Sequence, residues 1–202
     1  MEHTQENAGL GGTRWRRFAA VLVPAVVVVG ALGVGVANGA VPVSFAISGS
    51  TFRVSADHLH GTNFVQYGSV AVEKDGTKQI VAESGIQSAD LTNMCQVVAV
   101  PGTPLSMVLK AGGGSKPAHA EDLIIDMTDL SGDATFTNIN IGQDASTLGG
   151  PAGSGGLSGS FGQRADVVDI DNLRQTAYAT SAGTFTLPGL SLGFTTGAGC
   201  PS

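Results

Sequence analysis

The hydrophobic and polar positions divide the chain near Pro42. From Phe18 to Phe52 there is no charged residue, and Phe18 to Val36 is apolar apart from one proline and three glycines. As a helix that apolar stretch would span about 28 Å at about 1.5 Å per residue, close to the roughly 30 Å of a bilayer core. We therefore predict one N-terminal transmembrane or signal helix, assigned with its flank to residues 18–41.

Three arginines predict the direction in which this segment crosses the membrane. Arg14, Arg16 and Arg17 form a basic cluster immediately before it. Because positive charge is retained on the cytoplasmic side, residues 1–17 are expected inside the cell and residues 42–202 outside. A twin-arginine export signal is an alternative for this cluster, but the sequence favours an ordinary basic flank.

Whether the apolar segment is cleaved stays open. Its core is longer than the 7–15 residues of an ordinary signal peptide, which favours a retained anchor. Ala37 and Gly39 offer only a poor small-residue pair for cleavage. The prediction is therefore a membrane-associated protein, or a secreted one if the segment is removed.

After Pro42 the pattern changes to short alternating segments, beginning with Val43, Phe45 and Ile47. Each later segment is four to eight residues long and rich in Val, Ile, Phe and Thr, as expected for strands. Turn-forming residues separate the segments, and no stretch beyond residue 42 has a helical period. We predict one all-β domain, with strands in these ranges: 52–56, 65–72, 80–83, 96–100, 105–109, 123–127, 135–141, 167–170, 184–187 and 190–194.

A weak internal repeat bears on the β architecture. Residues 90–96, 126–132 and 169–175 align, with a degenerate copy at 58–61. In each full copy a polar pair, Thr or Asp followed by Asn or Asp, stands between two apolar residues. Such side chains bond nearby backbone and can turn a strand at a corner. Repeated strand-and-corner units suit a β-solenoid or β-prism, and a β-sandwich with similar hairpins is the alternative.

The Gly-rich composition places a long loop late in the chain. Residues 149–162 are almost wholly Gly, Ser, Ala and Pro, too few apolar groups to offset their chain entropy. We expect a surface loop within the single domain.

Charge excludes one class of partner. Beyond residue 40 there are seven Lys and Arg against fourteen Asp and Glu. An acidic surface repels phosphate backbones, so no nucleic acid is expected as a partner.

The two cysteines, Cys95 and Cys200, both follow the predicted membrane segment. In an oxidising compartment such a pair is most simply a disulfide, with free thiols or a metal pair as alternatives.

One pentapeptide has the form of a hydrolase motif. Gly189 to Gly193 spells G-x-S-x-G around Ser191, but no Asp, Glu or His follows it in the chain. In α/β-hydrolases both partners follow the serine, and the serine lies on a strand-to-helix turn. Ser191 is therefore a weak catalytic candidate, and the sequence favours a non-enzymatic protein.

Metal ligation has two weak candidates. His58 and His60 would project from one face of a strand and could share a metal. Asp126, Asp129 and Asp133 are oxygen ligands of the kind calcium uses, but their spacing fits no known calcium loop. Exposed polar positions explain both sets, so no metal is assigned. No glycine-rich loop opens a helix to hold phosphate, and no cofactor is predicted.

Several segments carry a family resemblance: the opening residues 3–18, and residues 93–96, 133–146 and 182–190. They are similar to an uncharacterised family of actinobacterial envelope proteins, exported or membrane-anchored, that often carries the label cholesterol esterase. The resemblance covers nearly the whole chain and implies an extracytoplasmic location. It brings no catalytic residues with it.

Three hypotheses follow. The leading one is a membrane-associated extracytoplasmic β domain in the cell envelope, acting in assembly or binding with a homo-oligomeric or envelope-protein partner. The second is the lipid or sterol ester hydrolase that the family label implies. The third is a lipid-binding module without catalysis.

Overall fold

The computed structural model describes residues 47–151, 154–197 and 199–200. The described part is all-β, as predicted, with nine strands and one short 3₁₀ helix. It contains no helix that is long and apolar enough to span a membrane. The predicted membrane segment at 18–41, with Arg14, Arg16 and Arg17, lies outside the described residues.

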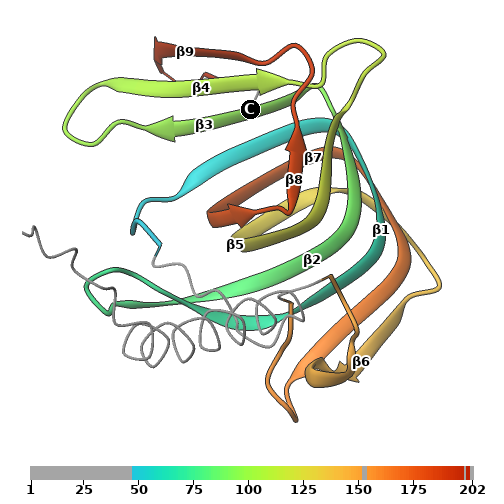
Figure 1. The fold of residues 1–202 in the computed structure, drawn as a ribbon. Helices are drawn as coiled ribbons and strands as arrows, with labels where there is room; N and C mark the ends of the chain where they lie inside the picture. Colours follow the sequence, from blue (N-terminus) through green and yellow to red (C-terminus); the bar gives the residue numbers. More distant parts are fainter. Residues whose placement is uncertain (1–46, 152–153, 198, 201–202) are drawn as a thin grey trace, which may run out of the picture. The chain divides into compact units, whose positions relative to one another are not determined.

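The strands belong to one antiparallel sheet (Figure 1). Their bounds are β1 Phe52–Val72, β2 Lys78–Thr92, β3 Met94–Ala99, β4 Leu105–Ala111, β5 Ala118–Thr137, β6 Asn140–Asp144, β7 Phe161–Ser181, β8 Thr184–Thr186 and β9 Ser191–Thr196, with the 3₁₀ helix η1 at Ala145–Thr147.

The sheet closes on itself. Its strand order is β6-β7-β5-β2-β1-β3-β4-β9, and β7 also pairs with β1. Strands β1, β2, β5 and β7 therefore form a ring, each pairing with two others of the four. From β1 the sheet continues outward through β3 and β4 to β9, while the short β8 pairs with β5 (Figure 1). The described residues thus form neither two separate sheets nor a stack of parallel repeats.

Residues in a left-handed backbone conformation lie within the long strands β1, β5 and β7 or directly between neighbouring strands. The non-glycine residues with positive φ, between 49° and 55°, are Asn63, Asn93, Asp122, Asn138 and Asn172. Asn and Asp tolerate this conformation better than most residues because their short polar side chains bond locally. In four cases the side-chain amide donates to an adjacent strand: Asn63 to Gln87 at 3.0 Å, Asn93 to Asp57 at 2.6 Å, Asn138 to Asp166 at 2.9 Å and Asn172 to Asp133 at 3.1 Å.

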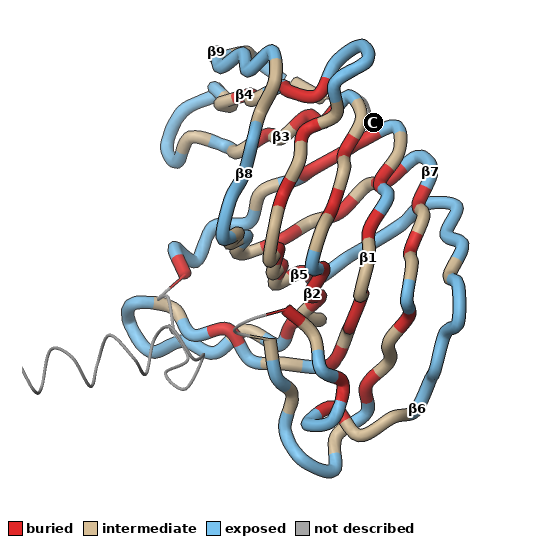
Figure 2. Tube along the Cα trace, turned by 45° about the vertical axis from the view of Figure 1, so that its right-hand side comes forward, coloured by how far each residue is buried: buried red, intermediate tan, exposed pale blue. Residues whose placement is uncertain are grey.

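At the corners within β1 and β7 the inward positions lie three residues apart instead of two. Around Asn63 the buried residues are Gly61 and Phe64, and around Asn172 they are Ile170 and Leu173. The pairing register nevertheless continues through the corner, so a single strand runs on (Figure 2). The prediction of strands four to eight residues long is therefore wrong for the main ones: β1 and β7 have 21 residues each and β5 has 20.

The predicted repeat corresponds to corners in two of its three copies. Asn93 and Asn172 occupy matching places in the repeat and both have positive φ. The copy at 126–132 differs: there β5 changes register against β7, and Gly132 has a φ of 153°.

The interior of the ring is narrow and filled by small residues. Ala89, Ala118, Ala120, Ala165 and Ala177 are at most 1% exposed. Few strands enclose little space, so small side chains are needed at some of the inward positions. Larger residues, including Leu59, Phe64, Ile86, Leu123, Val168 and Leu173, complete the core between them.

The Gly-rich stretch is a loop, as predicted, but it packs tightly against the outside of β1. Val65 and Tyr67, which point away from the ring interior, are buried with Ala145 and Leu148. A methyl group on Gly156 would lie 2.3 Å from the Cβ of Ala145. Glycine is required here by close approach. Only Pro151 and Gly162 of the described residues in this stretch are buried, as expected of a surface loop.

Candidate functional site

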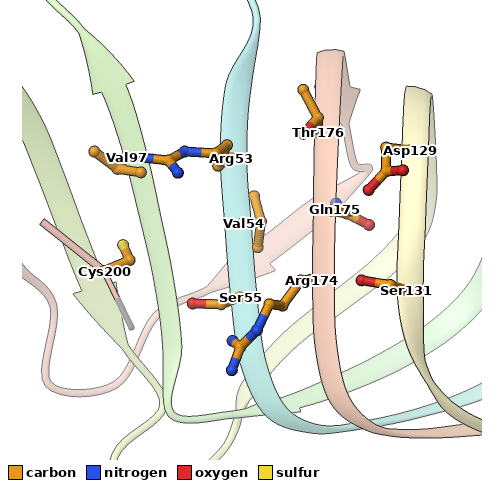
Figure 3. A pocket seen from close by; sticks show the side chains of 10 residues that line it. All are labelled: Arg53, Val54, Ser55, Val97, Asp129, Ser131, Arg174, Gln175, Thr176 and Cys200. Carbon is orange, nitrogen blue, oxygen red and sulfur yellow. The ribbon is translucent and has the colours of Figure 1, made fainter. Parts of the chain in front are cut away.

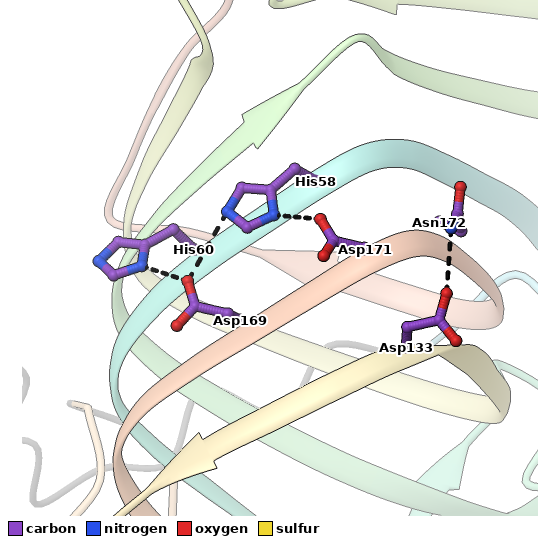
Figure 4. Close-up of polar contacts among 6 residues, drawn as sticks. All are labelled: His58, His60, Asp133, Asp169, Asp171 and Asn172. Carbon is purple, nitrogen blue, oxygen red and sulfur yellow. Dashed lines mark hydrogen bonds and ion pairs between the residues drawn. The ribbon is translucent and has the colours of Figure 1, made fainter.

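The histidines of the described residues, His58, His60 and His119, lie on the outer face of the ring, each beside a carboxylate. His58 and His60 are both on β1, and their Nδ1 atoms lie 2.7 Å from Oδ1 of Asp171 and Oδ1 of Asp169 on β7 (Figure 4). The Nε2 atom of His58 is also 3.6 Å from Asp169. Partial exposure of all four side chains means that water screens these pairs.

The same alternation of histidine and carboxylate continues from strand to strand across the sheet. Asp169 pairs with His60, His60 with Asp90, and Asp90 with His119. The ring nitrogens of His119 lie 2.8 Å from Asp90 and 2.8 Å from Glu121. Hydrogen bonds to Asp90 and then to Glu121 raise the pKa of His119 above its usual value. The result is an alternating row of acids and imidazoles.

The predicted metal candidates are not brought together. His58 and His60 face Asp171 and Asp169, whereas Asp133 accepts a hydrogen bond from Asn172 (Figure 4). Asp126 and Asp129 stand elsewhere on β5, opposite Ala179 and Thr176. Within the described part of the chain, no group of three or more His, Cys, Asp or Glu could hold a metal ion.

Asp126 belongs instead to a polar cluster next to the Gly-rich loop. It pairs with Glu83 across β2 and β5, and Glu83 accepts a hydrogen bond from the Tyr67 hydroxyl. That hydroxyl also accepts the N–H of Gly155 at 2.5 Å. Burial, and secondly the nearby charge of Glu83, raise the pKa of Asp126 to about 6. Tyr67 therefore connects the loop to a carboxyl pair, a role that the sequence did not indicate.

Ser191 lies on a strand and not on a turn before a helix. It begins β9, pairs with Lys110 of β4 and is exposed. In the parts of the chain that the structure describes, no histidine or carboxylate bonds its hydroxyl. The G-x-S-x-G match therefore has neither the backbone geometry nor the partners of a nucleophile elbow.

Cys95 and Cys200 lie at disulfide distance. Their Cα atoms are 5.8 Å apart, and 105 residues of sequence separate them. Cys95 is buried with Val97 and Val108, and Cys200 packs against this group. The C-terminal segment is thereby held against β3 and β4.

Strand β9 presents an exposed apolar edge. It is the last strand of the sheet order and, among the described strands, pairs only with β4. Leu192 is 58% exposed and Phe194 is 65% exposed. Leu190, just before the strand, and Leu105, at the start of β4, are also exposed. Residues 187–202 carry no charged side chain, which is the sequence signal for this edge.

The opposite end of the sheet is built differently. Strand β6 ends in Asp144 and is interrupted by a register shift between Ile141 and Gln143, with Gly142 at a φ of 88°. Bulges and charges are the devices by which natural edges avoid pairing with other chains. Since β9 has neither feature, it is the better candidate for association.

A family model described as a family of unknown function, DUF6230, matches residues 48–201. No curated protein and no solved structure matches the chain.

Proposed function

The chain belongs to the DUF6230 family, whose function is unknown, and we propose that it is a membrane-tethered assembly module that acts outside the cytoplasm. In this proposal two copies associate by pairing their β9 edges. The observation that supports it is the outer edge of β9, which pairs with no described strand, has no charged side chain and exposes Leu192 and Phe194.

The proposed location rests on the sequence before residue 42 and on the cysteines. An uncharged apolar stretch from Phe18 to Val36 prefers lipid to water, and the arginines before it favour a cytoplasmic N-terminus. Cys95 and Cys200, at disulfide distance, suit an oxidising compartment. An envelope location follows for the β domain.

A second copy is the proposed occupant of the β9 edge. A strand edge offers a row of backbone donors and acceptors, and another strand can satisfy them by extending the sheet. Two antiparallel β9 strands related by a two-fold axis would present the same surface to each other. Because residues 187–202 have no charge, no like charges would oppose one another along this edge.

The same pairing would cover exposed apolar side chains. Leu192 and Phe194 lie on one face of β9, across from Leu109 and Met107 of β4. Cross-strand contacts between such residues stabilise a sheet by roughly 0.2–1 kcal/mol per pair. Confinement of both copies to one membrane raises their effective concentration, so weak contacts suffice.

Light scattering of the full chain in detergent tests this proposal. We expect a dimer for the unaltered protein and a monomer for the double variant Leu192→Lys, Phe194→Lys, because buried unpaired charges oppose strand addition. Leu157→Lys is the matched control, since Leu157 is 78% exposed and lies in the Gly-rich loop. A monomeric unaltered protein, or equal loss of dimer in the control, would refute the proposed interface.

A further inference from the structure

A hollow beside β1 collects positive charge in a domain that is otherwise acidic. It has a volume of about 210 Å³, and Figure 3 shows the side chains that line it. Two of the seven Lys and Arg beyond residue 40, Arg53 and Arg174, line it together with only one of the fourteen acids, Asp129. Cys200 forms part of the wall.

The register places the polar groups of this hollow on one face. Ser55 of β1 pairs with Arg174 of β7, and Arg174 pairs with Ser131 of β5. In the next row Arg53 pairs with Thr176, and Thr176 with Asp129. These rows lie two residues apart on each strand, and alternate residues of a strand share a face. In Figure 3 Arg174 extends from β7 across β1 to the side of Ser55.

Two polar groups that line this hollow have no partner among the residues that the structure describes. Within the described residues, the Arg174 guanidinium makes no ion pair, and the Ser55 side chain makes no hydrogen bond. Ser55 is only 8% exposed. Among the described residues no buried side-chain nitrogen or oxygen lacks a hydrogen-bond partner, so the Ser55 hydroxyl is accessible from the hollow. A hydroxyl and a guanidinium that both reach the hollow can donate hydrogen bonds into it. An external group with negatively charged oxygens would satisfy both.

We propose that this hollow binds a phosphate group. Arg174 alone carries five N–H donors, and the hydroxyls of Ser55, Ser131 and Thr176 add three more potential donors. A carboxylate offers about four lone-pair positions on two oxygens, whereas a phosphate offers more oxygens in a tetrahedral arrangement. The hollow is several times the roughly 30 Å³ that one water occupies in the liquid, so it has room for such a group.

The phosphate could be free or part of a lipid headgroup, and the proposal is independent of β9 pairing. Isothermal titration calorimetry of the full chain in detergent, at constant ionic strength, would use inorganic phosphate and glycerol phosphate as probes. Tighter binding of glycerol phosphate identifies the headgroup as the source, and tighter binding of inorganic phosphate identifies the free ion. Either result supports the site.

Variants test the assignment to Arg174. We expect Arg174→Gln to weaken phosphate binding at least tenfold, and Ser55→Ala to weaken it severalfold. The matched control is Arg164→Gln on the same strand, because Arg164 lies outside the hollow and 3.7 Å from Asp166. Arg174→Lys, which keeps the charge and loses the planar fork, should bind between the unaltered protein and Arg174→Gln.

Two controls separate a loss of phosphate binding from a loss of folding or of dimer formation. Circular dichroism and the mass of the non-reduced protein would show whether Arg174→Gln keeps the sheet and the Cys95–Cys200 link. The variant Phe194→Lys should bind phosphate as the unaltered protein does, even where it abolishes the dimer. Absence of binding to both probes, or equal binding by Arg174→Gln and Arg164→Gln, would overturn the proposal.

Discussion

Asn172 shows how a single residue shapes a long strand. It lies within β7 with a φ of 55°, and its side-chain amide donates to Asp133 of β5 at 3.1 Å. A left-handed conformation costs most residues roughly 1–2 kcal/mol, costs Asn less, and costs Gly nothing. The corner therefore depends on the type of residue at this position.

Two substitutions of Asn172 separate backbone strain from the lost hydrogen bond. Both Asn172→Ala and Asn172→Gly remove the bond to Asp133, but only Ala resists positive φ. We expect Asn172→Ala to lower the free energy of unfolding by about 1 kcal/mol more than Asn172→Gly does. Urea denaturation measures the difference, and equal stability of the two variants would exclude strain at this corner.

Asp126 gives the domain a pH dependence of defined sign. Its pKa is raised from 3.8 to about 6 by burial and by Glu83, so the folded state disfavours the ionised form. The free energy of unfolding therefore falls as the pH rises from 3.8 to about 6, and it recovers as the pH falls again below about 6. Asp126→Asn should raise the free energy of unfolding at pH 7.5 by on the order of 1 kcal/mol, after allowance for solvent screening.

The gain from Asp126→Asn should shrink steadily between pH 7 and pH 4, where the folded wild-type carboxyl takes up its proton. Denaturant unfolding at several pH values tests this. A difference between the variant and the unaltered protein that stays constant over the range would contradict the assigned cause.

At the scale of elements, the Gly-rich loop is a packed part of the domain. Adjacent glycines in it differ sharply: a methyl group on Gly156 would meet Ala145 at 2.3 Å and the Tyr67 ring at 3.1 Å, whereas one on Gly155 meets nothing within 4 Å. We expect Gly156→Ala to lower the free energy of unfolding by about 1–3 kcal/mol through overpacking.

Gly155→Ala is the control for that change and should alter stability by less than about 0.5 kcal/mol. Limited proteolysis should also cleave the loop faster in Gly156→Ala. If both variants behaved alike, the loop would not be packed against Tyr67 as the structure has it.

The sequence predicted the positions of strand segments only between the corners at which the long strands bend. Alternation located the short segment 167–170 correctly, because burial alternates there with a period of two residues. It also located most of β9, at 190–194, although every residue of that range is exposed. It missed the continuity of β7, since the inward residues Ala165 and Val168, like Ile170 and Leu173, lie three apart across a corner. Where the alternation of inward and outward residues shifts by one position, the sequence looks as if the strand ended there.

At the scale of the whole molecule, ring closure could not be predicted. It depends on pairing between β1 and β7, which are about a hundred residues apart in the chain, and no local pattern encodes that register. The candidate sites share this dependence. His58 and His60 were foreseen as neighbours on one strand, but their acids come from β7, and the hollow around Arg174 combines residues from several strands and the C-terminal segment.

Association through β9 is the central functional claim, and cross-linking in the native membrane tests it most directly. Gly193 lies in the middle of β9 and has space for a side chain, as does Gly155 in the loop. A short bismaleimide should link full-length Gly193→Cys into covalent dimers and leave Gly155→Cys monomeric, with Cys95 and Cys200 joined to each other. Monomers only from Gly193→Cys, or dimers in equal yield from both variants, would contradict the account.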